Sequence, residues 1–580
     1  MPVMTLPSWL TGSALRERLG SLKQLLRHPS QLSHLAAVRR DARQFEAQCA
    51  RWQAAGDVSA PAAGAKTALF VSLTDWVVKA KTECALALAL KARGWRPVIL
   101  TYRWCRTAQR YYRACGLRDF VFLDDIATEP IPASTLQDAA AWLAGCRTIQ
   151  AIKDWRVRDV HIGRQMLASI TRSNHRNVDL NDPAHRQLLL RAVPEALQSV
   201  RTAERLLEET RPELAIFLDK DYLGIGAIYD TAINRGLNVI QWCGSQRDDG
   251  YTLKRYTPQT RHTHPQSIGP TTWSWVRELP WTGAEEAALR QEFTGRYEAG
   301  QWTSYYNRPY GRLRAKEELA TSLGLDPSKP TAVVFSHILW DSTFFWGDDL
   351  FDDYAEWLVE TAKAACANPR LNWIIKLHPA NAWKLQREGI KGELYDHIVL
   401  RQAIGELPPH VRVLDPEADV NTFSLFSLTD YCLTVRGTIG IEMACFGIPV
   451  LTAGTGRYSG LSFTIDSVSR KEYLAKLSML ETQPKPTAEQ TALAKRYAHA
   501  LFVLRPWYVR SLRSTYLPTR QLGHPLDHNL ELEATSLRGL AEAPDLRAFA
   551  EWAASREADF VSRPQPHHPG AERTKPMVTA

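Results

Sequence analysis

The stretch 431–454 contains a turn whose residue types suit the binding of an anion. A short apolar run at each end of the stretch has the composition of a buried parallel strand, and Arg436-Gly437-Thr438 leads from the first run into a helix. Gly437 allows a sharp turn, and Thr438 can cap the helix. The free N–H groups and dipole of such a helix N-terminus attract a phosphate, and Arg436 adds a positive charge beside them.

The same helix carries further candidate contacts. Ile439 supplies another N–H group, Gly440 lets a ligand or the neighbouring strand approach the first turn, and Glu442 can accept hydrogen bonds from a ribose. Gly447 and Pro449 end the helix and begin the next strand. The alternative interpretation is an ordinary crossover of a parallel sheet, in which the glycines serve packing alone.

A second stretch, 372–379, predicts a buried strand followed by polar groups. Its end carries Lys376, His378 and Pro379. Ligands of open α/β sheets gather at the carboxyl ends of the strands. We therefore expect the ammonium group of Lys376 and the imidazole of His378 to face the same crevice as the turn at Gly437 and to hold the same phosphate.

Together these motifs resemble the capsule polysaccharide synthesis family of bacterial glycosyltransferases. The resemblance is clear over 330–470 and rests on Lys376-Leu-His378-Pro379, Thr438-Ile-Gly440-Ile-Glu442, Gly447-Ile-Pro449-Val450 and the aromatic, glycine-containing segment 454–464. It implies the GT-B fold, in which two Rossmann-like domains face an interdomain cleft, and a nucleotide-sugar donor. CMP-linked Kdo is the favoured donor, with UDP- and GDP-sugars as alternatives.

Acidic residues after two other predicted strands are candidates for a catalytic base. Asp248 and Asp249 follow the predicted strand 238–242, and Asp341 follows the predicted strand 331–335. Such a group can relieve an acceptor hydroxyl of its proton. The Asp-Asp-Gly triplet also resembles the acidic motif of GT-B transferases that use CMP-sialic acid, where one acid is the general base. The alternative for the triplet is ordinary turn chemistry.

Three more residues are candidate substrate contacts. His337 follows the strand 331–335, and Arg457 and Tyr458 lie in the aromatic segment that resembles the family. For His337 and Asp341, the alternative is hydrogen bonding within the loop and helix capping. His262 and His264 form a poor ligand set and predict a polar loop, and the nine cysteines contain no Cys-x-x-Cys pair. We expect neither a metal ion nor a cofactor.

The alternation of strand and helix patterns over 580 residues predicts an α/β protein of two domains. We expect residues 471–517 to be helical. The expected units are a helical N-terminal extension and linker (1–65), a Rossmann-like acceptor-side domain (66–328), a Rossmann-like donor domain (329–520), and a helical segment with a disordered tail (521–580).

The net charge of +9 and the pI near 9.0 favour an anionic partner. The basic amphipathic helix predicted at 13–53 can lie on an anionic membrane or pack against the protein body. The sequence contains neither a signal-peptide pattern nor an apolar run of about eighteen residues, so we expect a cytoplasmic protein that can contact the inner membrane peripherally. Basic and aromatic residues do not interleave in one stripe, so we expect no nucleic acid.

These patterns favour a metal-independent glycosyltransferase. It would move a sugar from a nucleotide sugar to a glycan or glycolipid acceptor, namely a growing capsule or surface polysaccharide or its lipid-linked precursor. Two alternatives stay open: a nucleotide-sugar epimerase of the same fold, and a non-catalytic scaffold that binds glycan for export.

Overall fold

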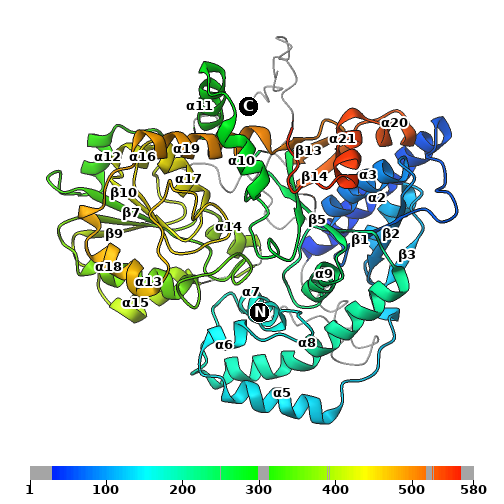
Figure 1. Ribbon diagram of the computed structural model, residues 1–580, viewed down its shortest axis with the longest axis horizontal. Coiled ribbons are helices and arrows are strands. Elements are labelled where there is room, and N and C mark those ends of the chain that lie inside the picture. The colour runs from blue at the N-terminus through cyan, green and yellow to red at the C-terminus, as the bar shows by residue number, and fades with distance from the viewer. Residues whose placement is uncertain are drawn as a thin grey trace.

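The computed structural model describes residues 29–247, 250–297, 312–387, 389–390, 392–516, 526 and 528–562. Two β-sheets lie side by side, the first on the right of Figure 1 and the second on the left, and helices cover both faces of each sheet. The expected α/β architecture of two Rossmann-like domains is confirmed. Within the described ranges, no helix has both the length and the apolar character needed to cross a membrane.

The first sheet has the strand order β12-β6-β5-β4-β1-β2-β3, and its strands are β1 (Thr67–Val71), β2 (Arg96–Thr101), β3 (Phe120–Phe122), β4 (Leu214–Phe217), β5 (Asn238–Gly244), β6 (Gly250–Tyr256) and β12 (Trp507–Tyr508). Strands β1 to β5 are parallel, and β6 is antiparallel to both β5 and β12. In β1, Ala68 and Phe70 pack on one face, whereas Leu69 and Val71 pack on the other. Both faces are apolar because both are covered.

The helices of the first domain are α2 (Pro29–Ala55), α3 (Val77–Lys91), α4 (Arg106–Ala114), α5 (Ala133–Gly145), α6 (Ile149–Lys153), α7 (Ile162–Asn174), α8 (Pro183–Thr210), α9 (Ile225–Asn234), α20 (Leu537–Ala541) and α21 (Pro544–Ala554), with a 3₁₀ turn at Leu123–Asp125. Phe45 and Trp52 of α2 are buried in the core with α3 and α4. This part of the predicted amphipathic helix therefore packs on the protein body, while its residues 13–28 lie outside the described residues.

The second sheet is parallel throughout, with the order β11-β10-β7-β8-β9. Its strands are β7 (Thr331–Phe335), β8 (Asn372–Lys376), β9 (Val411–Leu414), β10 (Tyr431–Thr434) and β11 (Val450–Thr452). The helices around it are α10 (Pro270–Glu278), α11 (Gly283–Tyr297), α12 (Lys316–Ser322), α13 (Tyr354–Cys366), α14 (Ala380–Arg387), α15 (Tyr395–Ile404), α16 (Thr422–Leu428), α17 (Thr438–Cys445), α18 (Arg470–Ser478) and α19 (Ala488–His499), with a 3₁₀ turn at Leu480–Thr482.

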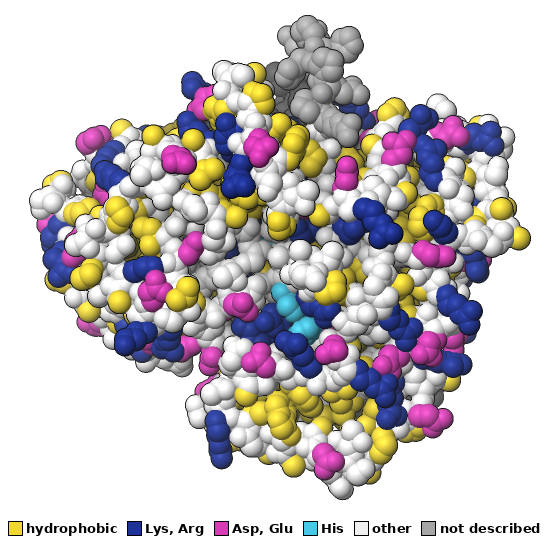
Figure 2. Space-filling view, viewed as in Figure 1, with side chains coloured by type: hydrophobic (Ala, Val, Ile, Leu, Met, Phe, Trp, Pro, Cys, Tyr) yellow, Lys and Arg dark blue, Asp and Glu magenta, His cyan; other side chains and the backbone are white. Residues whose placement is uncertain are grey.

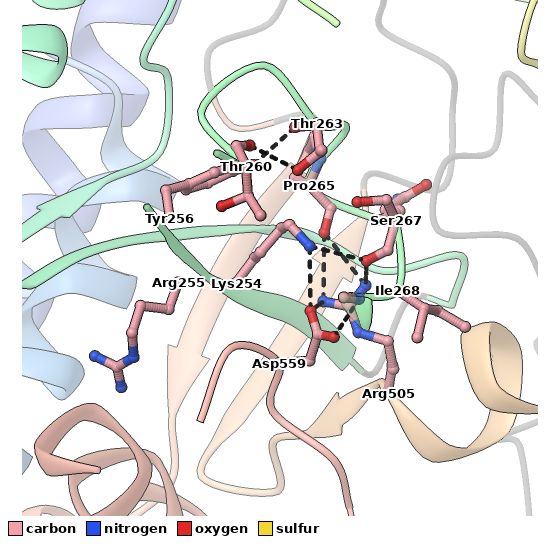
Figure 3. Close-up of polar contacts among 12 residues, drawn as sticks. Lys254, Arg255, Tyr256, Thr260, Thr263, Pro265, Ser267, Ile268, Arg505 and Asp559 are labelled. Atoms are coloured by element: carbon pink, nitrogen blue, oxygen red, sulfur yellow. Dashed lines mark hydrogen bonds and ion pairs between the residues drawn. The ribbon is translucent and has the colours of Figure 1, made fainter. Parts of the chain in front are cut away.

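The chain returns from the second domain to the first through a buried ionic cluster. Helix α19 continues as a π-helical turn (Ala500–Leu504) and leads to β12. Between them, Arg505 lies 3.1 Å from the carboxylate of Asp559, which also lies 3.3 Å from the ammonium of Lys254 on β6 (Figure 3). The backbone N–H of Gly269, just before α10, donates to the same carboxylate at 2.7 Å. Asp559 thus joins β6, the crossover and the start of α10.

Two segments of the first domain differ from what the sequence patterns predict. The prediction that 471–517 is helical is wrong at its end, because β12 pairs with β6, and β13 (Leu512–Tyr516) pairs with β14 (His528–Leu532). The stretch 250–256, for which the sequence patterns predict no strand, is the strand β6. Both errors have one cause, since the hydrogen bonds that define these strands come from segments distant in sequence.

The packing also bears on the domain boundaries. Helices α10 and α11 precede the expected boundary at residue 328, yet Trp273 and Phe293 of these helices belong to the core of the second sheet. Helices α20 and α21 follow the expected second domain, yet they pack on α3 of the first. We propose that the first domain combines 29–256 with 507–562, and that the second domain spans 270–505.

Candidate active site

A cavity of about 310 Å³ lies at the carboxyl ends of β7, β8 and β10, where the second domain faces the loop after β6. This volume lies at the lower end of the range for small-molecule sites. Sequence-predicted site residues in its lining are His337, Asp341, Lys376, His378, Pro379, Arg436, Gly437, Thr438, Ile439, Glu442 and Arg457. Other lining residues include His264, Tyr297, Ser336, Trp346 and Tyr354. The structure therefore brings the strand end at His378 and the turn at Gly437 to one cavity.

The N-terminus of α17 meets this cavity without a side-chain cap. Gly437 is the N-cap residue, so the expectation that Thr438 caps the helix is wrong, because Thr438 is already the first helical residue. Tyr458 donates from its hydroxyl to the carbonyl oxygen of Gly437 at 2.7 Å. A Cβ on Gly440 would lie 2.2 Å from that hydroxyl oxygen, so Gly440 makes room for Tyr458 rather than for a ligand. The uncapped helix end suits an anion.

Three imidazoles line the cavity, and the backbone fixes the proton position in each. The N–H of Ala380 donates to Nδ1 of His378 at 3.1 Å, and the N–H of Gln266 donates to Nδ1 of His264 at 3.0 Å. The N–H of Val435 donates to Nε2 of His337 at 3.2 Å, and that ring stacks on a tyrosine. Since each accepting nitrogen must have a lone pair, the other ring nitrogen carries the proton and can donate.

These imidazoles are neutral at neutral pH. Burial, followed by the charge of Lys384, lowers the pKa of His378 to about 4. Burial also lowers the pKa of His337 and of His264 well below the ordinary value. The cavity therefore offers three N–H donors of fixed direction that carry no net charge, and such donors can bind an anion.

Lys376 adds a positive charge to this set. Its side chain is almost fully buried, and its ammonium group donates to the carbonyl oxygen of Asp415 at 3.0 Å. Burial lowers the pKa of Lys376 to about 8, against a smaller opposing effect of Asp415. The group is therefore mainly protonated at pH 7 and titrates just above it.

The two arginines of the site are held by the protein itself. Arg436 is buried, pairs with the carboxylate of Asp349 and donates to the carbonyl oxygen of Trp346. Burial acts to lower the pKa of Arg436, but Asp349 more than offsets this, and the pKa is raised. Arg457 donates to the carbonyl oxygen of Arg436 and to the side chain of Gln266. The phosphate-binding role of Arg436 stays a prediction.

Glu442 is fully buried behind the turn. One carboxylate oxygen lies 3.3 Å from Arg296, the other accepts from the hydroxyl of Tyr297, and burial raises the pKa of Glu442. Both oxygens thus have protein partners, and a ribose hydroxyl would have to share them. The ribose contact of Glu442 stays a prediction.

Of the three candidate bases, the structure describes Asp341 only. Asp341 accepts from Arg172 of α7 at 3.1 Å and from Lys384 of α14, so it joins the two domains. Asp248 and Asp249 lie outside the described residues, between β5 and β6.

Sequence reasoning did not select His264. The pair His262 and His264 indicates only a poor set of metal ligands or a polar loop, and among the described residues no group of three His, Cys, Asp or Glu side chains could hold a metal ion. The signal that could have found His264 is its position in the segment after β6, where the chain passes from the first domain to the second.

The two facing Rossmann-like domains, with a cavity at the strand ends, define the GT-B architecture. No protein-family model and no curated protein matches the chain. Among solved structures, the chain is similar to KpsC of Thermosulfurimonas dismutans, a beta Kdo 2,4 transferase, with 13% identity and a TM-score of 0.30 over 57% of this chain and 87% of that one.

It is also similar to the UDP-GlcNAc 2-epimerase from Neisseria meningitidis, with 11% identity and a TM-score of 0.26 over 74% of this chain and 95% of that one. A third similar structure is the calicheamicin glycosyltransferase, with 13% identity and a TM-score of 0.25 over 75% and 94% of the two chains.

Proposed function

We propose that this protein is a glycosyltransferase that uses a nucleotide sugar. The observation that carries the proposal is the meeting, in one cavity between two Rossmann-like domains, of an uncapped helix N-terminus, three fixed imidazole donors and the Lys376 ammonium. The motif resemblance favours a CMP-linked acidic sugar of the Kdo type as donor. The acceptor is then a glycan or glycolipid of a capsule or surface polysaccharide.

In this proposal the cavity stabilises the leaving phosphate. As the glycosidic bond to phosphate breaks, negative charge grows on the phosphate oxygens, and donors already aimed at that position lower the barrier. The N-terminal N–H groups of α17, Nε2–H of His378 and Nδ1–H of His337 supply fixed donors, and Lys376 supplies a charge. These groups neutralise the phosphate without a metal ion.

We propose that Asp249 or Asp248, its neighbour in the sequence, is the base that takes the proton from the acceptor hydroxyl, with Asp249 favoured. Asp341 is less suited, because its carboxylate oxygens already contact Arg172 and Lys384 and are less accessible to an acceptor hydroxyl. Asp249→Ala should abolish transfer and leave donor binding unchanged. Undiminished turnover in this variant would move the base to another residue, with Asp341 tested next.

A thermal-shift screen against CMP, CDP, UDP and GDP tests the donor site directly, because a ligand that binds the folded state raises its stability. We expect CMP to give the largest shift. His378→Ala and Glu442→Ala should each weaken nucleotide binding, whereas His185→Ala on α8 serves as the matched control. If both variants bind the nucleotide with wild-type affinity, the assignment of the donor site to this cavity is wrong.

Incubation with the donor alone separates the transferase from an epimerase. A transferase consumes the nucleotide sugar only when an acceptor is present or by slow hydrolysis, whereas an epimerase converts it without any acceptor. A protein that binds glycan but neither binds nor turns over a nucleotide sugar would be a scaffold.

A further inference from the structure

A second and larger cavity, of about 710 Å³, lies next to the first at the domain interface. It is formed by the loop between α6 and α7, by the loop after β6, and by two loops of the second domain. The charged and titratable residues of its lining are Arg156, Asp159, His161, Arg261, His262 and Asp348. In Figure 2 a histidine surface flanked by Lys and Arg side chains is visible near the middle of the face between the two domains.

A thin wall of backbone separates the two cavities. The N–H of Gly347 donates to the carbonyl oxygen of His262 at 2.6 Å, and the N–H of His264 donates to the carbonyl oxygen of Gly456 at 2.8 Å. His262 lines the second cavity and His264 lines the first. A ligand in the second cavity therefore lies beside the proposed donor site and on the same interdomain face.

A series of three hydrogen-bonded side chains, Asp230, His161 and His262, reaches the second cavity. Asp230, which is buried, lies 3.1 Å from Nδ1 of His161, and Nε2 of His161 lies 3.4 Å from Nε2 of His262. A carboxylate only accepts, so Nδ1 of His161 carries its proton and Nε2 has the lone pair. Nε2 of His262 must then donate, which leaves the lone pair of His262 on Nδ1.

The Nδ1 atom of His262 can thus accept a hydrogen bond from a ligand. Within the described part of the chain, no hydrogen-bond partner of this atom is found, and the side chain is half-buried in the cavity lining. Burial, followed by the charge of Arg164, lowers the pKa of His262, so the ring stays neutral. A neutral acceptor of this kind suits a sugar hydroxyl.

The lining of the same cavity also offers a cation. Arg156 is exposed in the lining, and no ion pair involves it among the residues that the structure describes. It precedes a tight turn in which Arg158 and Asp159 have φ values of 50° and 61°, a left-handed conformation that favours glycine. The turn is fixed, because the N–H of Asn234's side chain donates to the carbonyl oxygen of Asp159 at 3.2 Å. Strained backbone of this kind is concentrated at binding sites.

We propose that this second cavity binds a carboxylated sugar residue of the acceptor glycan. The guanidinium of Arg156 holds the carboxylate, and Nδ1 of His262 accepts from a hydroxyl of the same sugar. This inference rests on the proposed function, since it supplies the acceptor for the neighbouring donor site. It also gives the positive net charge of the chain a specific anionic partner.

The test uses a matched pair of ligands, a Kdo disaccharide glycoside and its methyl ester, titrated calorimetrically into the full chain saturated with CMP. The wild type should bind the acid roughly tenfold more tightly than the ester, because the ester lacks the charge that Arg156 recognises. Arg156→Ala should abolish this preference. Arg158→Ala is the control, since Arg158 is an exposed neighbour that pairs with Glu204.

His262→Phe keeps a ring in place but removes the acceptor, and it should weaken both ligands while CMP affinity stays unchanged. Arg156→Ala alters only an exposed side chain, so it carries the test even if His262→Phe fails to fold. Equal affinity for acid and ester, unchanged preference in Arg156→Ala, or failure of the disaccharide to bind the CMP-saturated chain would overturn the proposal. Measured CMP binding and turnover judge the proposed function separately, because neither depends on the acid–ester difference.

Discussion

The burial of Lys376 predicts that nucleotide affinity falls just above neutral pH. Its pKa is lowered to about 8, so the ammonium is the dominant form at pH 7, whereas about 3% remains protonated at pH 9.5. An anion binds the protonated form better. Affinity should therefore be highest below pH 8 and should fall as the pH rises through this value.

The size of the effect follows from the contact that is lost. A hydrogen bond to a charged group contributes about 1.5–3 kcal/mol. The fall in the protonated fraction of Lys376 between pH 7 and pH 9.5 limits the loss of CMP affinity to roughly thirtyfold. We expect CMP to bind roughly ten- to thirtyfold more weakly at pH 9.5 than at pH 7. The phosphate of CMP adds no step in this window, because its second pKa is about 6. The histidines add none either, since their pKa values are lowered.

Isothermal titration of CMP from pH 7 to 9.5 checks this prediction. Lys376→Arg should bind with little pH dependence, because a guanidinium stays charged throughout the range. Lys376→Gln should bind weakly and equally at every pH. A flat profile in the wild type, or the same slope in Lys376→Gln, would show that Lys376 does not contact the phosphate.

Three further outcomes are expected. His378→Ala should raise the dissociation constant of CMP by about tenfold or more in a binding titration, because one donor to a charged phosphate is lost. Gly440→Ala should also weaken CMP binding, because the new Cβ would displace Tyr458 and the turn that it holds, and added Tyr458→Phe should restore part of the affinity. Asp559→Asn should lower the free energy of unfolding by about 3 kcal/mol in denaturant titrations, because two buried cations lose their partner.

Asp559 also gives a pH dependence with a definite sign. Burial alone would raise the pKa of this carboxyl, but Arg505 and Lys254 outweigh burial and hold it at about 2. The folded pKa lies below the unfolded value of about 3.9, so this stabilisation is complete above about pH 4 and is lost as the pH falls towards 2. Acid unfolding should start at higher pH in Asp559→Asn than in the wild type, as measured by circular dichroism.

The character of the site explains why neutral donors suffice. The three imidazoles and the N-terminus of α17 are dipoles held in place by backbone hydrogen bonds, so they need no reorganisation when charge grows on a phosphate. Full charges in the same buried space would require partners, as Arg436 requires Asp349. Lys376 is the exception, and its lowered pKa reflects the unfavourable burial of a charge.

Much of the fold is predictable from local patterns. The continuous apolar runs at 67–71, 331–335, 372–376 and 431–434 predict buried parallel strands, and all four are strands of the two sheets. Such runs are recognisable because a strand covered on both faces needs apolar side chains at every position. Strand β6 was not recognised, since its Lys254 and Arg255 give a polar pattern whose partners lie near the C-terminus.

The sequence by itself determined which strand ends carry polar groups and where a glycine turn precedes a helix, because composition and spacing act locally. Only the tertiary structure decided which of those groups already have partners. Arg436 pairs with Asp349, Glu442 with Arg296, and His264 comes from a distant loop to complete the cavity. The physical reason is that a buried charge or donor takes the nearest complementary group in space, and that group is set by packing rather than by chain position.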